Sequence, residues 1–404
     1  MHIVMVGPFG LGPKQTMRSR ALPMAEALTR RGHQVTLLLP PWSNPQDAGT
    51  TLQHGDVRII NLKLPQRIPV LFQASLGLSL LRHALALKPD VIHCFKPKAY
   101  SGAAAWCVWQ LRRAHMLHTR LVVDSDDWEG PGGWNDREPY KWPLKRLFAW
   151  QERWGLRHAD ALTLASRALQ TIAWSLGIPP ERVHYVPNGV RRVANASESR
   201  PQGQAEQQTA ERQPTLLLYT RFFEFGLERI VRLFARLAEH EPDLRFLIVG
   251  QGLFGEEQEF FRLLNDAHVY ERVSWLGMLP EEGLSLAFAQ ATLAVYPFDD
   301  TLLNRTKCAV KLTDLLGAGV PVVAEAVGQN AEYIVHGESG LLVCPGDEAA
   351  LCAAVGQLLH DEPLRRRIGE AARRRMCEHF SWDDLVGEVE AAYGHRPPAT
   401  TPVR

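Results

Sequence analysis

Residues 311–347 read "KLTDLLGAGVPVVAEAVGQNAEYIVHGESGLLVCPGD", and this stretch decides the fold of the C-terminal half of the chain. A helical pattern at 310–317 leads into the apolar run "PVVAE" at 321–325. A short, continuous apolar run is typical of a strand that is covered on both faces. The stretch therefore predicts a helix followed by a buried strand, the repeating unit of a parallel α/β sheet.

The same alternation extends outward to both ends of the chain. In the C-terminal half we expect strands at 215–220, 245–250, 273–279, 292–298 and 321–325, with helices at 226–239, 254–266, 283–290 and 310–317. In the N-terminal half we expect strands at 2–7, 33–40, 90–95, 120–125, 161–166 and 183–190, with helices at 17–32, 70–87, 100–114, 143–157 and 166–175. The pattern predicts an α/β protein of two doubly wound, Rossmann-like domains that face each other across a cleft, with ligands at the carboxyl ends of the strands.

The composition changes once, between the two series of elements. Residues 191–214 are rich in Gln, Ala, Ser, Glu and Arg and contain no aromatic residue, which is typical of a mobile linker or surface insertion. We therefore expect an N-terminal domain at 1–190 and a C-terminal domain at 215–380. Residues 381–404 are expected to form a helix that packs back on the N-terminal domain, followed by a disordered tail.

Composition and charge argue against nucleic-acid-binding, disulfide-rich and membrane-spanning proteins. The 404 residues include 45 Lys+Arg and 44 Asp+Glu, so the net charge does not indicate a nucleic-acid partner. The six cysteines have no Cys-x-x-Cys spacing, which favours reduced thiols over disulfides or a zinc ribbon. The N-terminus lacks the pattern of a signal peptide, and no apolar run approaches the length of a membrane span. We expect a cytoplasmic protein.

Several stretches, in order along the chain, resemble one enzyme family. They are "MHIVMVGPF", "VHYVPNGV", "LLLYTRF", "FLIVGQG", "VSWLGML" and the opening stretch at 311–347. This series resembles the retaining glycosyltransferases of family 4 (glycosyl transferases group 1), which have the two-domain GT-B fold. The resemblance implies metal-independent transfer of a sugar from a nucleotide sugar to an acceptor hydroxyl, with retention of configuration. It implies no cofactor, a UDP- or GDP-sugar as co-substrate, and a carbohydrate, glycolipid or small-molecule acceptor.

The leaving diphosphate needs positive charge, because negative charge grows on the leaving oxygen. The resemblance assigns this role to Arg221 and to a lysine at the position that Phe225 occupies here. We expect Lys311 to replace that lysine, since it lies in the first turn of a helix whose free N–H groups favour a phosphate. The family's two glutamates correspond to Thr306, which can offer a hydroxyl to the donor sugar, and Asp314, which can accept from the ribose.

Glycine-rich loops complete the donor site that the resemblance implies. Gly250 and Gly252 in one loop, and Gly277 and Met278 in the next, correspond to the loops where a backbone peptide meets the base. The first loop, with Gly10 and Gly12, corresponds to a mobile loop that closes under the donor.

The acidic stretch "VVDSDDWEG" at 122–130 raises three alternatives. Asp124 and Asp126 fit an Asp-x-Asp metal site, but no ligand-spaced cluster supports a metal elsewhere, and we expect none. Asp126 and Asp127 can instead be catalytic carboxylates in the reaction site, where the family often has a histidine. They would bind acceptor hydroxyls or balance the positive charge that develops on the sugar. The third alternative is that one of them only caps the following segment.

Tryptophans gather after this stretch. In a Gly/Pro loop, Trp128 and Trp134 suit stacking on an acceptor sugar as well as ordinary loop packing. Trp150 and Trp154, four residues apart, suit core anchors on a helix, whereas tryptophan with Lys and Arg also suits a membrane interface. A peripheral contact with the inner membrane surface is therefore one expected partner.

Two other functions compete with glycosyl transfer. Phe225 and Thr306 remove two expected site groups, which favours a non-catalytic nucleotide-sugar or carbohydrate-binding relative. The first loop, "GPFGLGPK", weakly suggests a dinucleotide-dependent oxidoreductase, but the next strand ends in "LLLPPW" without the acidic residue that a dinucleotide site requires.

Overall fold

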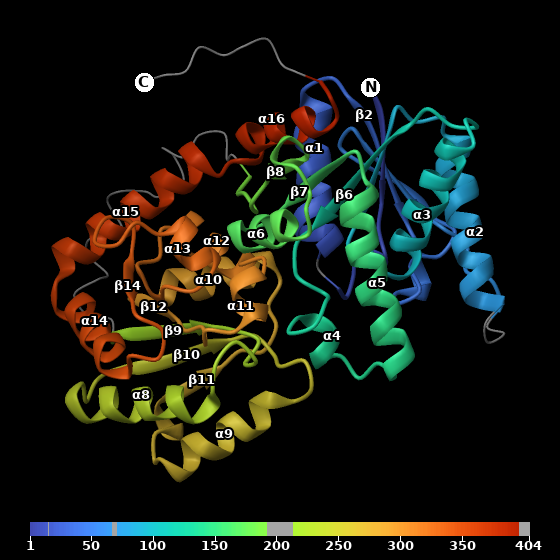
Figure 1. Ribbon diagram of the computed structural model, residues 1–404. Helices are drawn as coiled ribbons and strands as arrows, with labels where there is room; N and C mark the ends of the chain where they lie inside the picture. The colour runs from blue at the N-terminus through green and yellow to red at the C-terminus, as the bar shows by residue number, and fades with distance from the viewer. Residues whose placement is uncertain (15, 67–70, 192–212, 396–404) are drawn as a thin grey trace. The chain divides into compact units, whose positions relative to one another are not determined.

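The computed structural model describes residues 1–14, 16–66, 71–191 and 213–395 (Figure 1). The chain divides into two compact units. Unit 1 contains Met1–Arg191, Thr306–Cys308 and Trp382–Arg404, and unit 2 contains Arg192–Arg305 and Ala309–Ser381. Nearly all of the expected linker, 192–212, and the expected tail, 396–404, lie outside the described residues.

Unit 1 is built on an 8-stranded sheet in the order β3-β4-β2-β1-β5-β6-β7-β8. All neighbouring strands run parallel except β3, which is antiparallel to β4 at the edge. The strands are β1 (His2–Val6), β2 (Gln34–Leu39), β3 (Thr51–His54), β4 (Val57–Asn61), β5 (Val91–Phe95), β6 (Arg120–Ser125), β7 (Ala161–Leu164) and β8 (Val183–Tyr185). In this order β5 and β6 are neighbours, so the segments that follow them leave the sheet side by side.

Helices cover both faces of this sheet. The side chains of β1 are apolar on both faces, and each face packs against a different set of helices. Ile3 and Met5 pack with η1 (Met17–Ala21), α1 (Leu22–Arg30) and α16 (Trp382–Ala392). Val4 and Val6 pack on the other face with α2 (Leu71–Ala86), α3 (Ala99–Arg113), α5 (Trp142–His158) and α6 (Arg167–Ser175). The short helix α4 (Trp134–Arg137) precedes α5, and the 3-10 turns η2 (Pro45–Asp47) and η3 (Pro180–Arg182) lie in connections.

The last helix, α16, belongs to the core of unit 1. Trp382 at its start is 1% exposed and packs among the residues of α1 and β1. Within α16, Glu390 forms an ion pair with Arg31 at 2.8 Å, and just after its end the Tyr393 hydroxyl lies 2.8 Å from His93 Nδ1. The C-terminal segment therefore completes the apolar face that the N-terminal strands begin.

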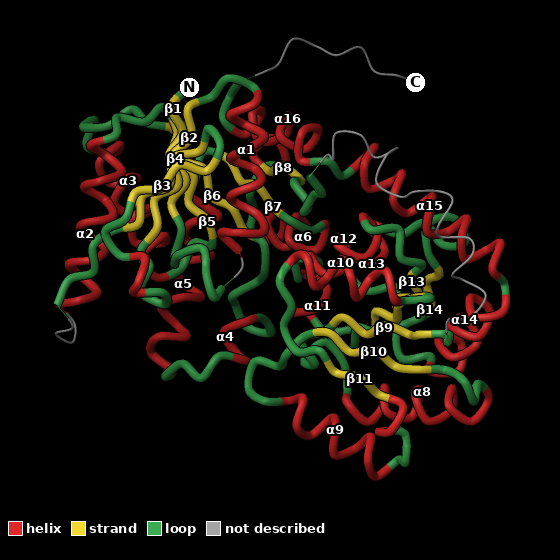
Figure 2. Tube along the Cα trace, turned by 180° about the vertical axis from the view of Figure 1, so that it is seen from behind, coloured by secondary structure: helices red, strands yellow, loops and turns green. Residues whose placement is uncertain are grey.

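Unit 2 contains a 6-stranded parallel sheet in the order β11-β10-β9-β12-β13-β14, drawn in yellow in Figure 2. The strands are β9 (Thr215–Tyr219), β10 (Arg245–Val249), β11 (Val273–Trp275), β12 (Leu293–Tyr296), β13 (Val322–Glu325) and β14 (Leu341–Val343). The helical segments are α8 (Leu227–His240), α9 (Glu256–Asp266), η4 (Tyr270–Arg272), α10 (Glu281–Gln290), α11 (Leu302–Thr306), α12 (Val310–Gly317), α13 (Gln329–Tyr333), α14 (Glu348–His360) and α15 (Glu362–His379). Leu216, Leu218 and Phe246 form a core with α8, α9 and α14 on one face, and α10 and α12 lie on the other (Figure 1).

Both units are therefore the doubly wound α/β domains that the alternating pattern predicts. Among the described helices, none combines the length and the apolar character that a membrane span requires.

Candidate functional site

In unit 1, charged side chains gather where β5 and β6 end. The register pairs Phe95 with Asp124, so Lys96 and the acidic turn after β6 start at the same level. Lys96 Nζ lies 3.0 Å from Asp126 Oδ1 and 2.7 Å from Asp127 Oδ2. Glu129 joins the group through Lys96 at 3.6 Å and Lys98 at 2.6 Å. We call these five residues the carboxylate cluster.

The carboxylate cluster is buried, so its charges act strongly on one another. Burial opposes the charge on Lys96, but Asp126, Asp127 and Glu129 together hold the pKa of Lys96 well above its ordinary value. Burial and the neighbouring Asp126 raise the pKa of Asp127 to about 6, although Lys96 acts in the opposite direction. A carboxyl that titrates near neutral pH in an enzyme is suited to proton transfer or to accepting a substrate hydroxyl.

Asp124 and Asp126 have different partners in the structure. The two carboxylates bind different cations: Asp124 accepts from Arg20 Nε at 2.8 Å and Nη2 at 2.7 Å, whereas Asp126 faces Lys96 and accepts from Thr16 Oγ1 at 3.0 Å. Arg20 and Asp124 are 1% and 0% exposed. Across the part of the chain that the structure describes, no three His, Cys, Asp or Glu side chains gather as metal ligands.

The capping interpretation of Asp126 and Asp127 is wrong for the described residues. The next helix, α4, has Gly133 at its N-cap and no side-chain cap. Asp127 Oδ1 instead accepts from the backbone N–H of Cys308 at 3.1 Å, and Asp126 faces Thr16 and Lys96. The carboxylates are held by long-range partners that local sequence cannot reveal.

Trp128 is buried, which corrects the prediction that its face stacks on an acceptor sugar. The side chain is 5% exposed, packs in the apolar core, and donates from Nε1 to Pro131 O at 3.0 Å. Gly130 and Gly133 make this possible, since a Cβ on Gly130 would lie 2.2 Å from the indole ring. The loop that follows Trp128 therefore packs against the indole ring of this tryptophan. Trp134 is half-buried at the start of α4.

The first loop of unit 1 rests on the segment that follows β2. Gly10 lies against Pro41, where an added Cβ would be 3.3 Å from the proline ring. Ser43 Oγ donates to Gly12 O at 3.3 Å, and Trp42 Nε1 donates to Pro8 O at 2.8 Å. The expected closing motion of this loop remains a prediction.

In unit 2, the residues predicted to hold the diphosphate surround Tyr219 at the end of β9. Lys311 Nζ lies 5.2 Å from the centre of the Tyr219 ring. Burial and the charge of Asp314 raise the pKa of Tyr219, while Arg221 acts in the opposite direction. Arg221 and Asp314 therefore both lie near this ring. Arg221 Nε is buried and, among the described residues, has no hydrogen-bond partner.

Asp314 is the carboxyl of this group, which we call the tyrosine-219 cluster (Tyr219, Arg221, Lys311 and Asp314). Burial raises the pKa of Asp314 to about 7, against the effect of Lys311 and with that of Glu281. Lys311 and Asp314 lie three residues apart on α12, whose N-cap, Ala309, provides no side-chain cap. An anion there would meet two cations at the positive end of the helix dipole.

Phe225 and Thr306 depart from the family pattern in the structure as well. Phe225 is 5% exposed and packs edge-to-face on Phe260, so no cation occupies that position. Thr306 is fully buried in unit 1, with its carbonyl 3.3 Å from Ser166 Oγ. The expectation that the Thr306 hydroxyl is open to a donor sugar is wrong, because the helix end that carries it is packed.

The predicted base-binding loops meet at two of their glycines. Gly250 N donates to Gly277 O at 2.7 Å, and Trp275 Nε1 donates to Gly250 O at 2.8 Å. Gly250 has a φ of +124°, and a Cβ there would lie 1.8 Å from Thr220 O, so the position requires glycine. Gly252 donates its N–H to Glu257 at 2.9 Å, and Met278 is half-exposed. Loop packing alone accounts for the glycine at 250.

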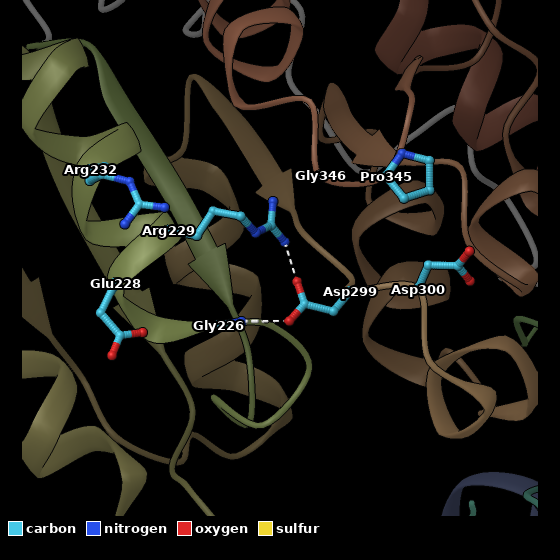
Figure 3. A pocket seen from close by; sticks show the side chains of 8 residues that line it. All are labelled: Gly226, Glu228, Arg229, Arg232, Asp299, Asp300, Pro345 and Gly346. Carbon is cyan, nitrogen blue, oxygen red and sulfur yellow. Dashed lines mark hydrogen bonds and ion pairs between the residues drawn. The ribbon is translucent and has the colours of Figure 1, made fainter.

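A hollow of about 580 Å³ lies elsewhere at the carboxyl edge of this sheet (Figure 3). Two of its charged lining residues pair with each other: Asp299 binds Gly226 N and Arg229, and Arg229 also binds the buried Glu325 at 2.8 Å. The lining is Gly226, Glu228, Arg229, Arg232, Asp299, Asp300, Pro345 and Gly346. Neither Arg221 nor Lys311 lines it, so we do not assign the diphosphate to this hollow.

Sequence reasoning missed Lys96, Lys98 and Arg20. A signal for the lysines was present, because "KPK" at 96–98 directly follows a predicted strand that neighbours the one before Asp126. Arg20 lies in an ordinary helical pattern, where nothing marks an arginine as buried.

Comparison with known proteins identifies the family of the chain. The family profile "Glycosyl transferase 4-like domain" matches residues 15–189, and "Glycosyl transferases group 1" matches 199–375. The chain is 27% identical to N-acetyl-alpha-D-glucosaminyl L-malate synthase of Bacillus anthracis over 60% of its length, and this match spans 61% of that relative. It is 23% identical to D-inositol 3-phosphate glycosyltransferase of Corynebacterium diphtheriae, over 95% of this chain and 91% of that one.

A solved structure supports the fold independently. Alr3699/HepE of Anabaena, in complex with UDP and glucose, superposes with a TM-score of 0.68 and 16% identity over 97% of this chain and 99% of that chain. Each half of the sequence matches a profile of the same enzyme class, and each unit has the expected sheet. The chain therefore belongs to the group 1 glycosyltransferases of the GT4 type, with the GT-B fold.

Proposed function

We propose that this glycosyltransferase moves a sugar from a nucleotide sugar to an acceptor hydroxyl, with retention of configuration and without a metal. The observation that carries the proposal is the tyrosine-219 cluster in unit 2. There Arg221 Nε is buried and has no hydrogen-bond partner among the described residues, and Lys311 lies in the first turn of a helix without a side-chain cap. An unpaired buried guanidinium atom is costly unless a ligand pairs with it.

The leaving diphosphate is the ligand that fits this cluster. Negative charge increases on the diphosphate as the bond to the sugar breaks, and preorganised cations stabilise that charge. Arg221, Lys311 and the N–H groups at the start of α12 supply positive charge of the kind that a metal ion supplies elsewhere. Asp314, on the same helix, accepts a hydrogen bond from the nucleotide ribose. HepE, which has a similar fold and is solved with UDP and glucose, supports a UDP-sugar as the donor, with a GDP-sugar as the second choice.

Acceptor binding is assigned to the carboxylate cluster in unit 1. Asp126 and Asp127 accept hydrogen bonds from acceptor hydroxyls, and the ion pairs with Lys96 hold both carboxylates in place. With Trp128 buried, Trp134 is the remaining aromatic candidate for contact with a sugar, glycolipid or small-molecule acceptor.

A ligand screen followed by an assay of nucleotide release tests this function. Purified protein is mixed with UDP-, GDP- and ADP-sugars, and the rise in melting temperature identifies the donor. Arg221→Ala and Lys311→Ala should each slow transfer, because each variant loses about 2–4 kcal/mol of transition-state stabilisation. Activity should survive EDTA, and the anomeric configuration of the product should match that of the donor.

Two outcomes would contradict the proposal. Loss of activity on chelation, restored by Mn²⁺, would require a metal. Donor binding without nucleotide release under any acceptor would instead identify a nucleotide-sugar-binding relative, the alternative that Phe225 and the buried Thr306 favour.

A further inference from the structure

Helix α5 of unit 1 exposes large apolar side chains to solvent. Trp142 is 67% exposed, Leu147 45% and Trp150 49%. The interpretation of Trp150 as a core anchor is therefore wrong, and Trp154, which is half-buried, packs edge-to-face on Trp109 of α3 at 5.4 Å. The ring centres of Trp150 and Trp154 lie 6.2 Å apart, so the exposed Trp150 ring packs against the half-buried one. Exposed aromatic clusters of this kind mark interaction sites more often than ordinary surface.

Positive charge accompanies these rings on α5. Arg146, Arg153 and Arg157 are exposed on α5, and the Arg146 guanidinium lies 4.8 Å from the centre of the Trp142 ring. The one acidic residue in α5, Glu152, is fully buried, and burial with the nearby Glu129 raises its pKa well above the ordinary value. The outward face of the helix is therefore cationic.

The neighbouring helix extends the same chemistry. Helix α3 packs between α2 and α5 on this face of the sheet (Figure 1). Its sequence contains no acidic residue, it exposes Trp106, and its Arg113 lies 4.9 Å from the centre of the Trp109 ring. Because both helices share this character, the surface is wider than a single helix.

We propose that the outward face of α5 (Trp142, Arg146, Leu147, Trp150, Arg153 and Arg157) binds the surface of a bilayer that contains anionic lipid. Tryptophan rings favour the boundary between head groups and acyl chains, and arginines bind lipid phosphates bidentately. A helix of 17 residues spans roughly 25 Å, enough to lie along the membrane over several head groups. The proposal does not rest on the reaction, since none of these residues belongs to the carboxylate cluster.

A second basic helix shows that charge alone does not make this surface. Helix α15 contains six arginines at 365–367 and 373–375, but Glu362, Glu370 and Glu378 are interspersed with them. No large apolar side chain is exposed along Glu362–His379. This helix is therefore a matched control for non-specific attraction to an anionic surface.

Vesicle flotation tests the proposal with the full chain. The probes are vesicles of phosphatidylcholine alone and vesicles with added phosphatidylglycerol. The wild-type protein should float with the anionic vesicles, less so at high salt, and hardly with the neutral ones. Trp142→Ala/Trp150→Ala and Arg146→Glu/Arg153→Glu should each weaken binding at least about tenfold, because each cation near the surface contributes about fivefold.

Two control variants and one enzymatic measurement complete the design. Trp174→Ala removes a tryptophan of α6 that is 45% exposed, and Arg366→Glu/Arg367→Glu reverses charge on α15; both should float like the wild type. Absence of flotation with anionic vesicles, or equal flotation of the α5 variants, would overturn the proposal. Donor hydrolysis should be unchanged in the α5 variants, so failure here leaves the proposed function intact.

Discussion

Lys96 occupies an unusual position, since one ammonium group faces three carboxylates in a buried site. Its backbone is also in the left-handed region, with a φ of +46°, which is uncommon for a lysine. Such strain is found where the surrounding structure holds a residue in place for function. Asp126 and Asp127 are therefore held in position before a substrate arrives.

Exchanging Asp126 for Asn tests whether this arrangement serves the reaction. Asn preserves the shape and removes the charge, while Lys96 keeps Asp127 and Glu129 as partners. We expect donor affinity to stay close to the wild-type value and transfer to slow about a hundredfold, the usual scale for a positioned acid or base. Steady-state kinetics, with the melting temperature measured in parallel, checks this. If Asp126→Asn and Asp127→Asn both transfer sugar at the wild-type rate, the cluster is only structural.

Asp314 should make donor binding depend on pH. Its pKa is raised to about 7, so the carboxyl is largely protonated at pH 6 and charged at pH 8. The charged form accepts a ribose hydrogen bond more strongly. Donor affinity should therefore rise as the pH increases through about 7, whereas that of Asp314→Asn should stay flat over the same range. Calorimetric titration with UDP measures both, and equal pH dependence in the two proteins would refute the role.

The raised pKa of Asp314 also has a consequence for stability. The ordinary aspartate pKa is about 3.9, so between about pH 4 and 7 the folded state binds more protons than the unfolded state at this site. This contribution is fully present below about pH 4 and is lost as the pH rises towards 7. Urea unfolding across this range should show a shallower decline for Asp314→Asn than for the wild type.

At the scale of single elements, strands and helices with strong apolar periodicity were predictable. The helix at 310–317 and the strand at 120–125 have the predicted bounds. The hairpin of β3 and β4 was missed because all four residues of β3, "TLQH", are exposed at the sheet edge and show no apolar alternation. Burial of charged groups was also not predictable, since Arg20 meets Asp124 only through the packing of η1 against β6. The same holds for Trp128, whose burial depends on two later glycines.

The end of β13 carries a charged residue that holds three elements of unit 2 together. Glu325 is fully buried and accepts from Arg229 on α8, from Phe298 N after β12, and from Gly346 N after β14. Glu325→Gln should lower the free energy of unfolding by about 3–5 kcal/mol, because it leaves a largely buried arginine short of its partner. Urea denaturation measures this difference.

Glu348 provides a control for Glu325, because its partner is also an arginine of α8. Glu348 pairs with Arg232 of α8 at 2.5 Å, but both side chains are accessible to water. Exposed ion pairs contribute at most about 1 kcal/mol, so Glu348→Gln should change stability little. Equal losses in the two variants would show that burial does not determine the contribution of Glu325.

At the scale of the whole molecule, the order of the chain and the division into units do not coincide. Unit 1 begins the chain and also ends its described part, because α16 packs on α1 and β8 after unit 2 is complete. Each unit nevertheless has its own apolar core of buried side chains. We expect local stability to follow the cores and not the order of the sequence.

Trp382 is the residue that tests this division most sharply. It is 1% exposed at the start of α16, in the core shared with α1 and β1, although it follows unit 2 in sequence. Trp382→Ala removes a large buried side chain and should cost about 3–5 kcal/mol. Hydrogen exchange should then quicken in η1, α1, β1 and β2, while the strands of unit 2 keep wild-type rates.

The reciprocal variant supplies the control. Phe246 is fully buried in unit 2, where it stacks on Phe234 at 4.2 Å. Phe246→Ala removes a comparable aromatic group, and exchange should quicken in β9, β10 and α8 but not in β1. If Trp382→Ala accelerates exchange equally in both sheets, the two cores unfold together as one cooperative unit. If the acceleration stays within unit 1, the last helix of the chain stabilises the unit that the first strand begins.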